Sequence, residues 1–258
     1  MKDEVENNGI LSITKAIAAK KPAFGQDPWL ATLLRNNEVR GCVMNVEPDG
    51  LVVSDLPADS LKYVCEVIGD SGVQFSRIAG PARSAVGIAE DWSAHADLEW
   101  AISHEWTAYS LDKVTMPSEK AEGRLRFANQ DEKYIVAEWG SYYEEEKPAP
   151  ISVTKFLLYK LDEGELYVWD DGGPKTLIAV SGLTENCARV SAVFTPREFR
   201  GNGYASIAVA EVTQKLLESG KKYVTLLVDK HDPRVMRIYE RLGYEKIGSK
   251  VNISLGNP

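Results

Sequence analysis

The sequence has few of the residues on which disulfide frameworks and metal sites depend. Of its 258 residues, three are cysteines and three are histidines. The cysteines Cys42, Cys65 and Cys187 are far apart and show no CxxC spacing, so we expect reduced, buried thiols. No two histidines have a spacing that would put them on one helix face, and no metal site is therefore predicted.

Long apolar runs and an excess of basic residues are also missing. No run approaches the roughly 20 residues of a membrane span, and the acidic, polar start MKDEVENNGI is unlike a signal peptide. With 38 acidic against 30 basic residues the net charge is −8, which repels phosphate backbones and anionic lipid surfaces. We expect a cytoplasmic protein with no nucleic-acid or membrane partner; the oligomeric state is left open.

Length and pattern predict two domains, because 258 residues exceed the usual domain size of about 100 to 150. The polar stretch Met116–Gly123 is the expected linker between an N-terminal α/β lobe, residues 1–116, and a second domain, residues 124–258. From Val39 onward the residue pattern of the first half predicts, in this order, two strands, a helix, a strand, a helix and a final strand. The first of these helices has apolar residues at helical spacing and is expected to end at Gly69.

The second half repeats this order from Lys175 onward. A strand and a helix are expected within residues 124–143, and the charged tract Tyr143–Pro150 is interpreted as a surface loop. The elements that follow are strands 166–170, 175–183 and 187–194, a helix over 205–219, a strand over 223–229, a helix opened by Asp232-Pro233 and closed by Gly243, and the last strands within 244–255.

Two glycines stand where one of these helices begins, in the stretch VFTPREFRGNGYAS (Val193–Ser206). A helix N-terminus presents unpaired N–H groups, and glycines let an anion such as a phosphate approach them. Two other interpretations are open: a structural turn that needs positive φ, and a dinucleotide-binding fold. Against the latter, Ser206 replaces the third glycine, and only 29 residues (258 − 229) follow Asp229.

The segment Arg200–Ala205 resembles the Arg/Gln-x-x-Gly-x-Gly/Ala signature of the GNAT superfamily of N-acetyltransferases. The downstream DPRVMRIYERLGYEKIG is similar to that family's Asn-x-x-Ala-x-x-x-Tyr-x-x-x-Gly-Tyr/Phe segment, with Asp232, Val235 and Met236 as departures. The resemblance covers residues 124–258 well. It implies an α/β (α+β) fold with a mixed, mostly antiparallel sheet flanked by helices. The first half is either a degenerate GNAT-like lobe that shapes the amine site or an unrelated α/β domain.

The resemblance also implies a co-substrate, acetyl-CoA, and residues that bind it. The loop and helix would bind the pyrophosphate, and the preceding strand would pair with the pantetheine arm. The implied cofactor-binding residues are Ala192, Val193, Phe194, Thr195, Arg200, Gly201, Asn202, Gly203, Tyr204, Ala205, Ser206 and Asp232. Asp232 is alternatively only the N-cap of its helix.

The expected reaction is transfer of the acetyl group to the amine of a small molecule or peptide. A backbone N–H of a bulged strand around Ala192–Phe194 would polarise the thioester carbonyl, and Tyr239 would protonate the departing thiolate. Tyr239 is alternatively a core residue with its hydroxyl satisfied by the backbone. Glu185, Glu198 or a water relay would serve as the base. The alternative function is a non-catalytic acyl-CoA-binding or regulatory module.

Overall fold

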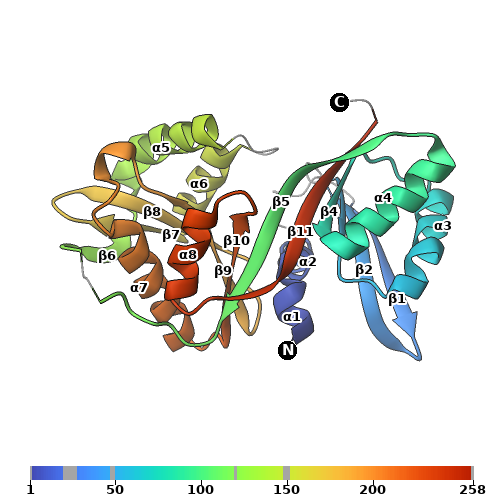
Figure 1. The fold of residues 1–258 in the computed structure, drawn as a ribbon, viewed down its shortest axis with the longest axis horizontal. Coiled ribbons are helices and arrows are strands. Elements are labelled where there is room, and N and C mark those ends of the chain that lie inside the picture. Colours follow the sequence, from blue (N-terminus) through green and yellow to red (C-terminus); the bar gives the residue numbers. More distant parts are fainter. Residues whose placement is uncertain (1, 20–27, 47–49, 119–120, 148–151, 257–258) are drawn as a thin grey trace. The chain divides into compact units, whose positions relative to one another are not determined.

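The computed structural model describes residues 2–19, 28–46, 50–118, 121–147 and 152–256 (Figure 1). Residues 119 and 120 of the expected linker and residues 148–150 of the expected surface loop lie outside these ranges. In chain order the elements are α1 (Lys2–Glu6), α2 (Asn8–Ala18), β1 (Trp29–Arg35), β2 (Glu38–Val46), β3 (Gly50–Val53), the 3-10 helix η2 (Ala58–Ser60), α3 (Leu61–Ser71), β4 (Arg77–Pro81), α4 (Ala82–Ala96), β5 (Trp100–Leu111), β6 (Arg124–Phe127), the 3-10 helix η3 (Gln130–Glu132), α5 (Lys133–Glu146), α6 (Val153–Asp162), β7 (Leu166–Asp170), β8 (Pro174–Ser181), β9 (Cys187–Phe194), the 3-10 helix η4 (Arg197–Phe199), α7 (Tyr204–Glu218), β10 (Tyr223–Asp229), α8 (Pro233–Arg241) and β11 (Glu245–Leu255).

The chain forms two compact units. The first comprises residues 1–108, 228–231 and 246–258, and the second comprises residues 109–227 and 232–245. The chain therefore passes between the units four times: within β5, within β10, between His231 and Asp232, and where β11 begins. The domain boundaries expected from the sequence, 1–116 and 124–258, stay a prediction, because compactness does not test whether each segment folds alone.

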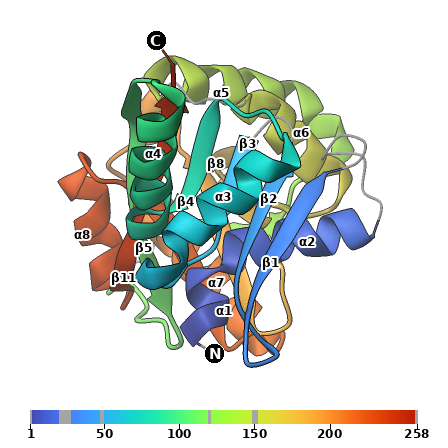
Figure 2. The same ribbon diagram turned by 90° about the vertical axis from the view of Figure 1, so that its right-hand side faces the viewer.

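In the first unit the strands lie in the order β1-β2-β3-β4-β11-β5. Side chains alternate between the two faces of a strand. Val43, Leu51 and Val53 pack with the apolar faces of α3 and α4, whereas Met44 and Val52 pack with Ile10 of α2. The sheet is thus covered on both faces, and Figure 2 shows α3 and α4 in front of its strands.

In the second unit the strands lie in the order β10-β9-β8-β7-β6. Helices α5 and α6 cover one face through a core that includes Trp139, Leu157, Leu177 and Phe194. Helix α7 packs against β7, β8 and β9. Across both units β3–β4 and β9–β10 are parallel, while β1–β2, β2–β3, β4–β11, β6–β7, β7–β8 and β8–β9 are antiparallel. The expected mixed, mostly antiparallel sheet flanked by helices is confirmed.

The predicted repetition of element order is confirmed as well. The series β2, β3, η2, α3, β4, α4, β5 recurs as β8, β9, η4, α7, β10, α8, β11. In both series the first and second strands pair antiparallel, and the second and third strands pair parallel. The 3-10 helix and the first long helix connect the two strands of the parallel pair.

Some element boundaries differ from expectation. Helix α3 passes through Gly69 and stops at Gly72, whose φ of 69° gives the left-handed conformation that ends a helix. Helix α5 continues to Glu146, into the tract interpreted as a loop, and residues 244–255 supply a single strand. The residue pattern had not predicted α1, α2, β1 or α6.

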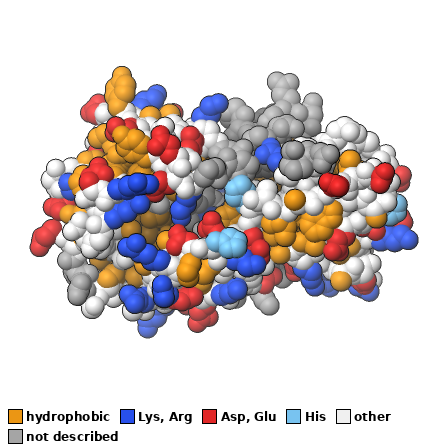
Figure 3. Space-filling view, turned by 45° about the horizontal axis from the view of Figure 1, so that its top comes forward, with side chains coloured by type: hydrophobic (Ala, Val, Ile, Leu, Met, Phe, Trp, Pro, Cys, Tyr) orange, Lys and Arg blue, Asp and Glu red, His pale blue; other side chains and the backbone are white. Residues whose placement is uncertain are grey.

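Figure 3 shows acidic and basic side chains on the same face of the molecule, in keeping with the modest net charge. Among the described residues, none of the helices is both long enough and apolar enough to cross a bilayer.

Candidate active site

Strand β9 contains a bulge near its C-terminal end. Ser191 pairs with Ala179 of β8, and Phe194 pairs with Leu177. Two residues of β9, Ala192 and Val193, therefore lie opposite the single residue between Leu177 and Ala179. Ala192 has a φ of +46°, a left-handed conformation that few non-glycine residues adopt. The bulge expected from the resemblance is confirmed.

Strands β9 and β10 pair over only part of their lengths. Within these two strands, every residue of which is described, the parallel register joins Cys187–Arg189 to Tyr223–Thr225. Strand β9 continues to Phe194 and β10 to Asp229. The bulged end of β9 thus lies beyond the pairing, where its backbone groups on the β10 side are not used by the sheet.

The two glycines lie between η4 and α7, and both have left-handed backbones. Gly201 has a φ of +86° and Gly203 a φ of +78°. The need for a positive φ would by itself account for glycine at both positions, without any ligand. However, a Cβ added at either position would meet no atom within 4 Å. Gly203 is the N-cap of α7, and no side chain caps this helix. The turn is therefore open to a ligand as well as left-handed.

The antiparallel pairing of β8 with β9 rules out the dinucleotide-binding interpretation. That fold requires a parallel sheet in which the glycine turn follows a strand flanked by parallel neighbours.

Arg200 is held beside the turn by several contacts. Its Nε donates to the carbonyl of Thr195 at 2.8 Å, and its Nη2 donates to Oε2 of Glu146 at 2.7 Å. Arg197 donates to the other oxygen of Glu146 at 2.9 Å. Burial raises the pKa of Glu146, but the hydrogen bonds from Arg200 and Arg197 outweigh it and leave that pKa lowered. Glu146 is thus ionised at neutral pH and offsets part of the positive charge expected at the turn.

The remaining residues of the turn are arranged around its backbone. Asn202 donates to the carbonyl of Phe199 at 3.1 Å, and Tyr204 donates to Oδ2 of Asp171 at 2.5 Å. The Oγ1 atom of Thr195 lies 2.8 Å from that of Thr176. Ala205 and Ser206 form the first turn of α7 with Tyr204. These bonds tie the side chains down and leave the N–H groups of the first helical turn as the exposed feature.

Asp232 is the N-cap of α8, as one of the two interpretations predicted. Its Oδ1 accepts from the backbone N–H of Val235 at 3.2 Å. Its Oδ2 lies 3.3 Å from Nζ of Lys147, which follows the last residue of α5. The carboxylate is therefore both used in capping and partly neutralised.

The N-cap assignment gives a stability prediction. Asp232→Ala should lower the free energy of unfolding by about 1 kcal/mol, the usual cost of a lost cap. Asp232→Asn retains a capping oxygen and should stay close to wild type. Urea denaturation of the two variants measures this; an alanine variant as stable as the asparagine variant would contradict a capping role.

Tyr239 lies on α8 with its side chain almost buried, 8% exposed. Burial, followed by the nearby Tyr143 and Asp232, raises the pKa of Tyr239 well above its usual value. Its ring meets that of Tyr244 edge to face, with centroids 5.9 Å apart. Whereas Tyr244 is hydrogen bonded to Thr213 at 2.7 Å, the hydroxyl of Tyr239 has no hydrogen-bond partner in the described part of the chain. The expected backbone partner is not seen there, and the hydroxyl stays protonated at neutral pH.

The C-terminal end of α5 contacts the bulge, the glycine turn and the start of α8, and no local sequence pattern predicts these contacts. The ring of Tyr143 lies 6.0 Å from that of Phe194 at the bulge, and Tyr143 also raises the pKa of Tyr239. Glu146 contacts Arg200 beside the glycine turn, and Lys147 contacts Asp232 on α8. Bulge, turn and α8 are thus brought together around one helix end. The capping sequence around Ser152, which begins α6, was the available signal that α5 ends before it.

Neither glutamate considered as a base is placed as a buried catalytic group. Glu185 is exposed and precedes β9, so the five residue-to-residue steps from Cys187 to Ala192 alone place it ~17 Å or more from the bulge. Glu198 is exposed on η4.

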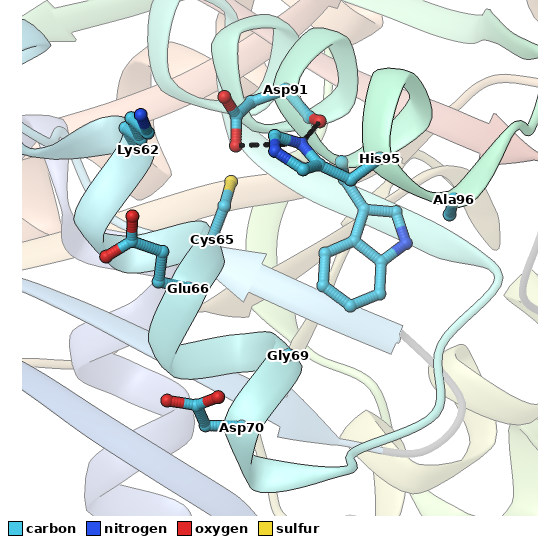
Figure 4. Close-up of a pocket in the computed structure, with 9 residues that line it drawn as sticks. Lys62, Cys65, Glu66, Gly69, Asp70, Asp91, His95 and Ala96 are labelled. Atoms are coloured by element: carbon cyan, nitrogen blue, oxygen red, sulfur yellow. Dashed lines mark hydrogen bonds and ion pairs between the residues drawn. The ribbon is translucent and has the colours of Figure 1, made fainter.

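A separate cavity of about 570 Å³ lies between α3 and α4 in the first unit (Figure 4). Burial, and secondarily a hydrogen bond to Asp91, raise the pKa of Cys65 to about 12, which makes its thiol a poor nucleophile. His95 lies 2.7 Å from the carbonyl of Asp91 through Nδ1. Among the described residues no group of three or more His, Cys, Asp or Glu side chains is arranged to hold a metal ion.

Comparison with known proteins agrees with this geometry. Residues 173–253 match the family described as FR47-like protein, and no curated protein sequence is significantly similar to the chain. A GCN5-related N-acetyltransferase from Kribbella flavida superposes with a TM-score of 0.65 at 15% identity, covering 98% of this chain and 96% of its own. A GCN5-related N-acetyltransferase from Sphaerobacter thermophilus gives 0.59 at 17% identity, covering 95% and 86%. A tandem GNAT protein from the clavulanic acid biosynthesis pathway gives 0.52 at 13% identity, covering 100% and 97%.

The chain therefore has the fold of the GNAT acetyltransferases, as the resemblance implied, and its length matches two-part members of that fold. Fold and family match together support acyl transfer in general.

Proposed function

We propose that the protein is an acetyl-CoA-dependent N-acetyltransferase. The observation that carries the proposal is the open, left-handed glycine turn at Gly201 and Gly203, placed between the bulged end of β9 and the uncapped N-terminus of α7. Such a helix start binds phosphate through its backbone N–H groups and its partial positive charge.

The residues of this region fit the parts of acetyl-CoA in order along the chain. The N–H groups from Gly201 to Ser206 would hold the pyrophosphate, and Arg200 would add a positive charge beside it. The backbone of Ala192–Phe194, unused by β10, would pair with the pantetheine arm. Asp232 would face the cofactor from the start of α8, with its charge offset by Lys147.

Bound acetyl-CoA supplies a thioester already activated for transfer. A backbone N–H at the bulge would donate to the carbonyl oxygen as negative charge develops there. Tyr239 would donate its hydroxyl proton to the departing sulfur. Burial keeps that hydroxyl protonated and the lack of a described partner leaves it available. Since Glu185 and Glu198 are exposed, we assign removal of the amine proton to water.

A non-catalytic acyl-CoA-binding module is the second candidate, and the absence of a buried carboxylate base at the bulge among the described residues is what favours it. The two candidates differ in one observable. An enzyme releases CoA in the presence of an amine, whereas a binding module retains acetyl-CoA unchanged. A titration with acetyl-CoA followed by thiol detection over amino acids, polyamines, aminoglycosides and peptides separates them.

The first unit repeats the fold elements but not the turn. In the corresponding segment η2 leads into α3 without a glycine, and no residue from Leu51 to Ser71 has a positive φ. We therefore expect one equivalent of acetyl-CoA per chain. Calorimetric titration measures the stoichiometry, and two equivalents of similar affinity would contradict the assignment of the site to the glycine turn.

A further inference from the structure

Arg189 differs from three other arginines of the second unit, Arg126, Arg197 and Arg200, in having no described carboxylate beside it. Arg126 contacts Glu132 and Asp170, both at 2.6 Å, and Arg197 and Arg200 share Glu146. Arg189 has no carboxylate partner among the described residues, and its Nε is buried without a hydrogen-bond acceptor. Burial lowers the pKa of Arg189 to about 10, which still leaves the guanidinium charged at neutral pH.

Arg189 as a whole is half-buried, but its Nε is inaccessible to water and has no acceptor among the described residues, which is costly for a charged group and requires an explanation. Removing water from a guanidinium is unfavourable unless an anion or several acceptors replace the water. Here the fold supplies no such anion from its own described side chains. An anionic ligand would complete the site.

The position of Arg189 places it beside the proposed reaction centre. It is the last residue of β9 in the parallel register with β10, opposite Thr225, and three residues before the bulge at Ala192. Three residues of strand span ~10 Å, a distance that a long side chain and a small substrate bridge together.

The neighbours of Arg189 on the same face are polar and small. Arg189 pairs with Ser181 of β8, and Ser191 lies two residues along β9, so these side chains share a face. Ser181 and Ser191 are hydrogen bonded to each other at 2.7 Å. Because Ala179, which pairs with Ser191, belongs to the core under α5 and α6, this is the face that those helices cover.

The order of sites along the chain decides which substrate reaches Arg189. In the proposed function the phosphates lie at Gly201–Ser206 and the thioester lies at Ala192–Phe194. Arg189 lies on the other side of the thioester from the phosphates, where the acceptor must approach. We infer that Arg189 binds a carboxylate of the acceptor, and that the acceptors are therefore amines that carry a carboxylate, namely amino acids. This inference rests on the proposed function.

The test compares amino acids with their amides, which differ only in the carboxylate. With saturating acetyl-CoA, wild type should show a kcat/KM for its best amino acid at least ~10²-fold above that for the corresponding amide. Arg189→Gln should remove this preference by raising KM for the amino acid, with acetyl-CoA affinity unchanged. Arg124→Gln, at an exposed arginine of β6, serves as the matched control and should retain it. A preference that survives in Arg189→Gln would overturn the inference.

Stability gives a second readout that is independent of turnover. Because Arg189 has no described anionic partner, Arg189→Met should leave Tm unchanged or raise it. A clear fall in Tm would show that the guanidinium already makes stabilising contacts, and would contradict a ligand role.

Direct binding keeps this inference separate from the proposed function. If acetyl-CoA binds and no amine is acetylated, the enzyme assignment fails, and binding of N-acetyl amino acids and of their amides is measured by calorimetry. Preference of wild type, but not of Arg189→Gln, for the carboxylate compounds supports the site. Equal affinity for the two compounds contradicts it.

Discussion

Gly203→Val is expected to abolish measurable acetyl-CoA binding. The valine side chain would occupy the open space beside the first turn of α7, where the pyrophosphate is proposed to lie. Hydrogen bonds to charged groups contribute about 1.5–3 kcal/mol each, so the loss of two would weaken binding by ~10²-fold or more. Calorimetric titration of acetyl-CoA into the variant measures the effect.

The control must separate this loss from backbone strain, because a β-branched residue at positive φ costs about 1–3 kcal/mol of stability. Gly220 offers it. It follows the same helix at the opposite end, has a φ of +97°, and would also accept a Cβ without an atom within 4 Å. Gly220→Val should show a similar fall in Tm with acetyl-CoA affinity near wild type. Equal affinity in the Gly203 variant and wild type would refute the phosphate site.

Tyr239→Phe is expected to reduce turnover by roughly 10²- to 10⁴-fold, the usual effect of removing a general acid. The substitution keeps the ring that packs against Tyr244 and removes only the hydroxyl. Since that hydroxyl has no hydrogen-bond partner within the described residues, its loss leaves no buried group unsatisfied there. Stability and acetyl-CoA affinity should therefore be retained while kcat falls.

Tyr244→Phe is the matched control for this prediction. It removes a hydroxyl that is already bonded to Thr213, so it should lower stability and leave kcat near wild type. Steady-state rates of CoA release at saturating acetyl-CoA and acceptor distinguish the two variants. Wild-type kcat in Tyr239→Phe would mean that water protonates the departing sulfur.

Local sequence predicted those parts of the fold that local forces decide. Apolar residues at helical spacing and the glycine after the last turn located α7, and Asp232-Pro233 located the start of α8. The same rule misplaced the end of α3, because Gly69 and Gly72 are both glycines near a helix end and only the latter adopts positive φ.

The site was predicted where it is contiguous and missed where distant segments meet. The stretch from Ala192 to Ser206 could be recognised from its own residues. The contacts of Glu146 with Arg200 and of Lys147 with Asp232 join positions 54 and 85 residues apart, and no local pattern encodes such pairing. Arg189 could not be recognised from local sequence either. In CARVSAVF it has the position of a polar residue in an alternating strand, and the burial of its Nε depends on elements packed against β9.

The central claim is that this chain binds acetyl-CoA at the glycine turn and transfers its acetyl group to an amine. Its most direct test is the release of CoA by the 258-residue chain at saturating acetyl-CoA, with and without an amino acid acceptor. We predict CoA release that depends on the acceptor, together with saturable binding of one equivalent of acetyl-CoA. Binding without release would favour the binding module, and a failure to bind acetyl-CoA at all would contradict the account.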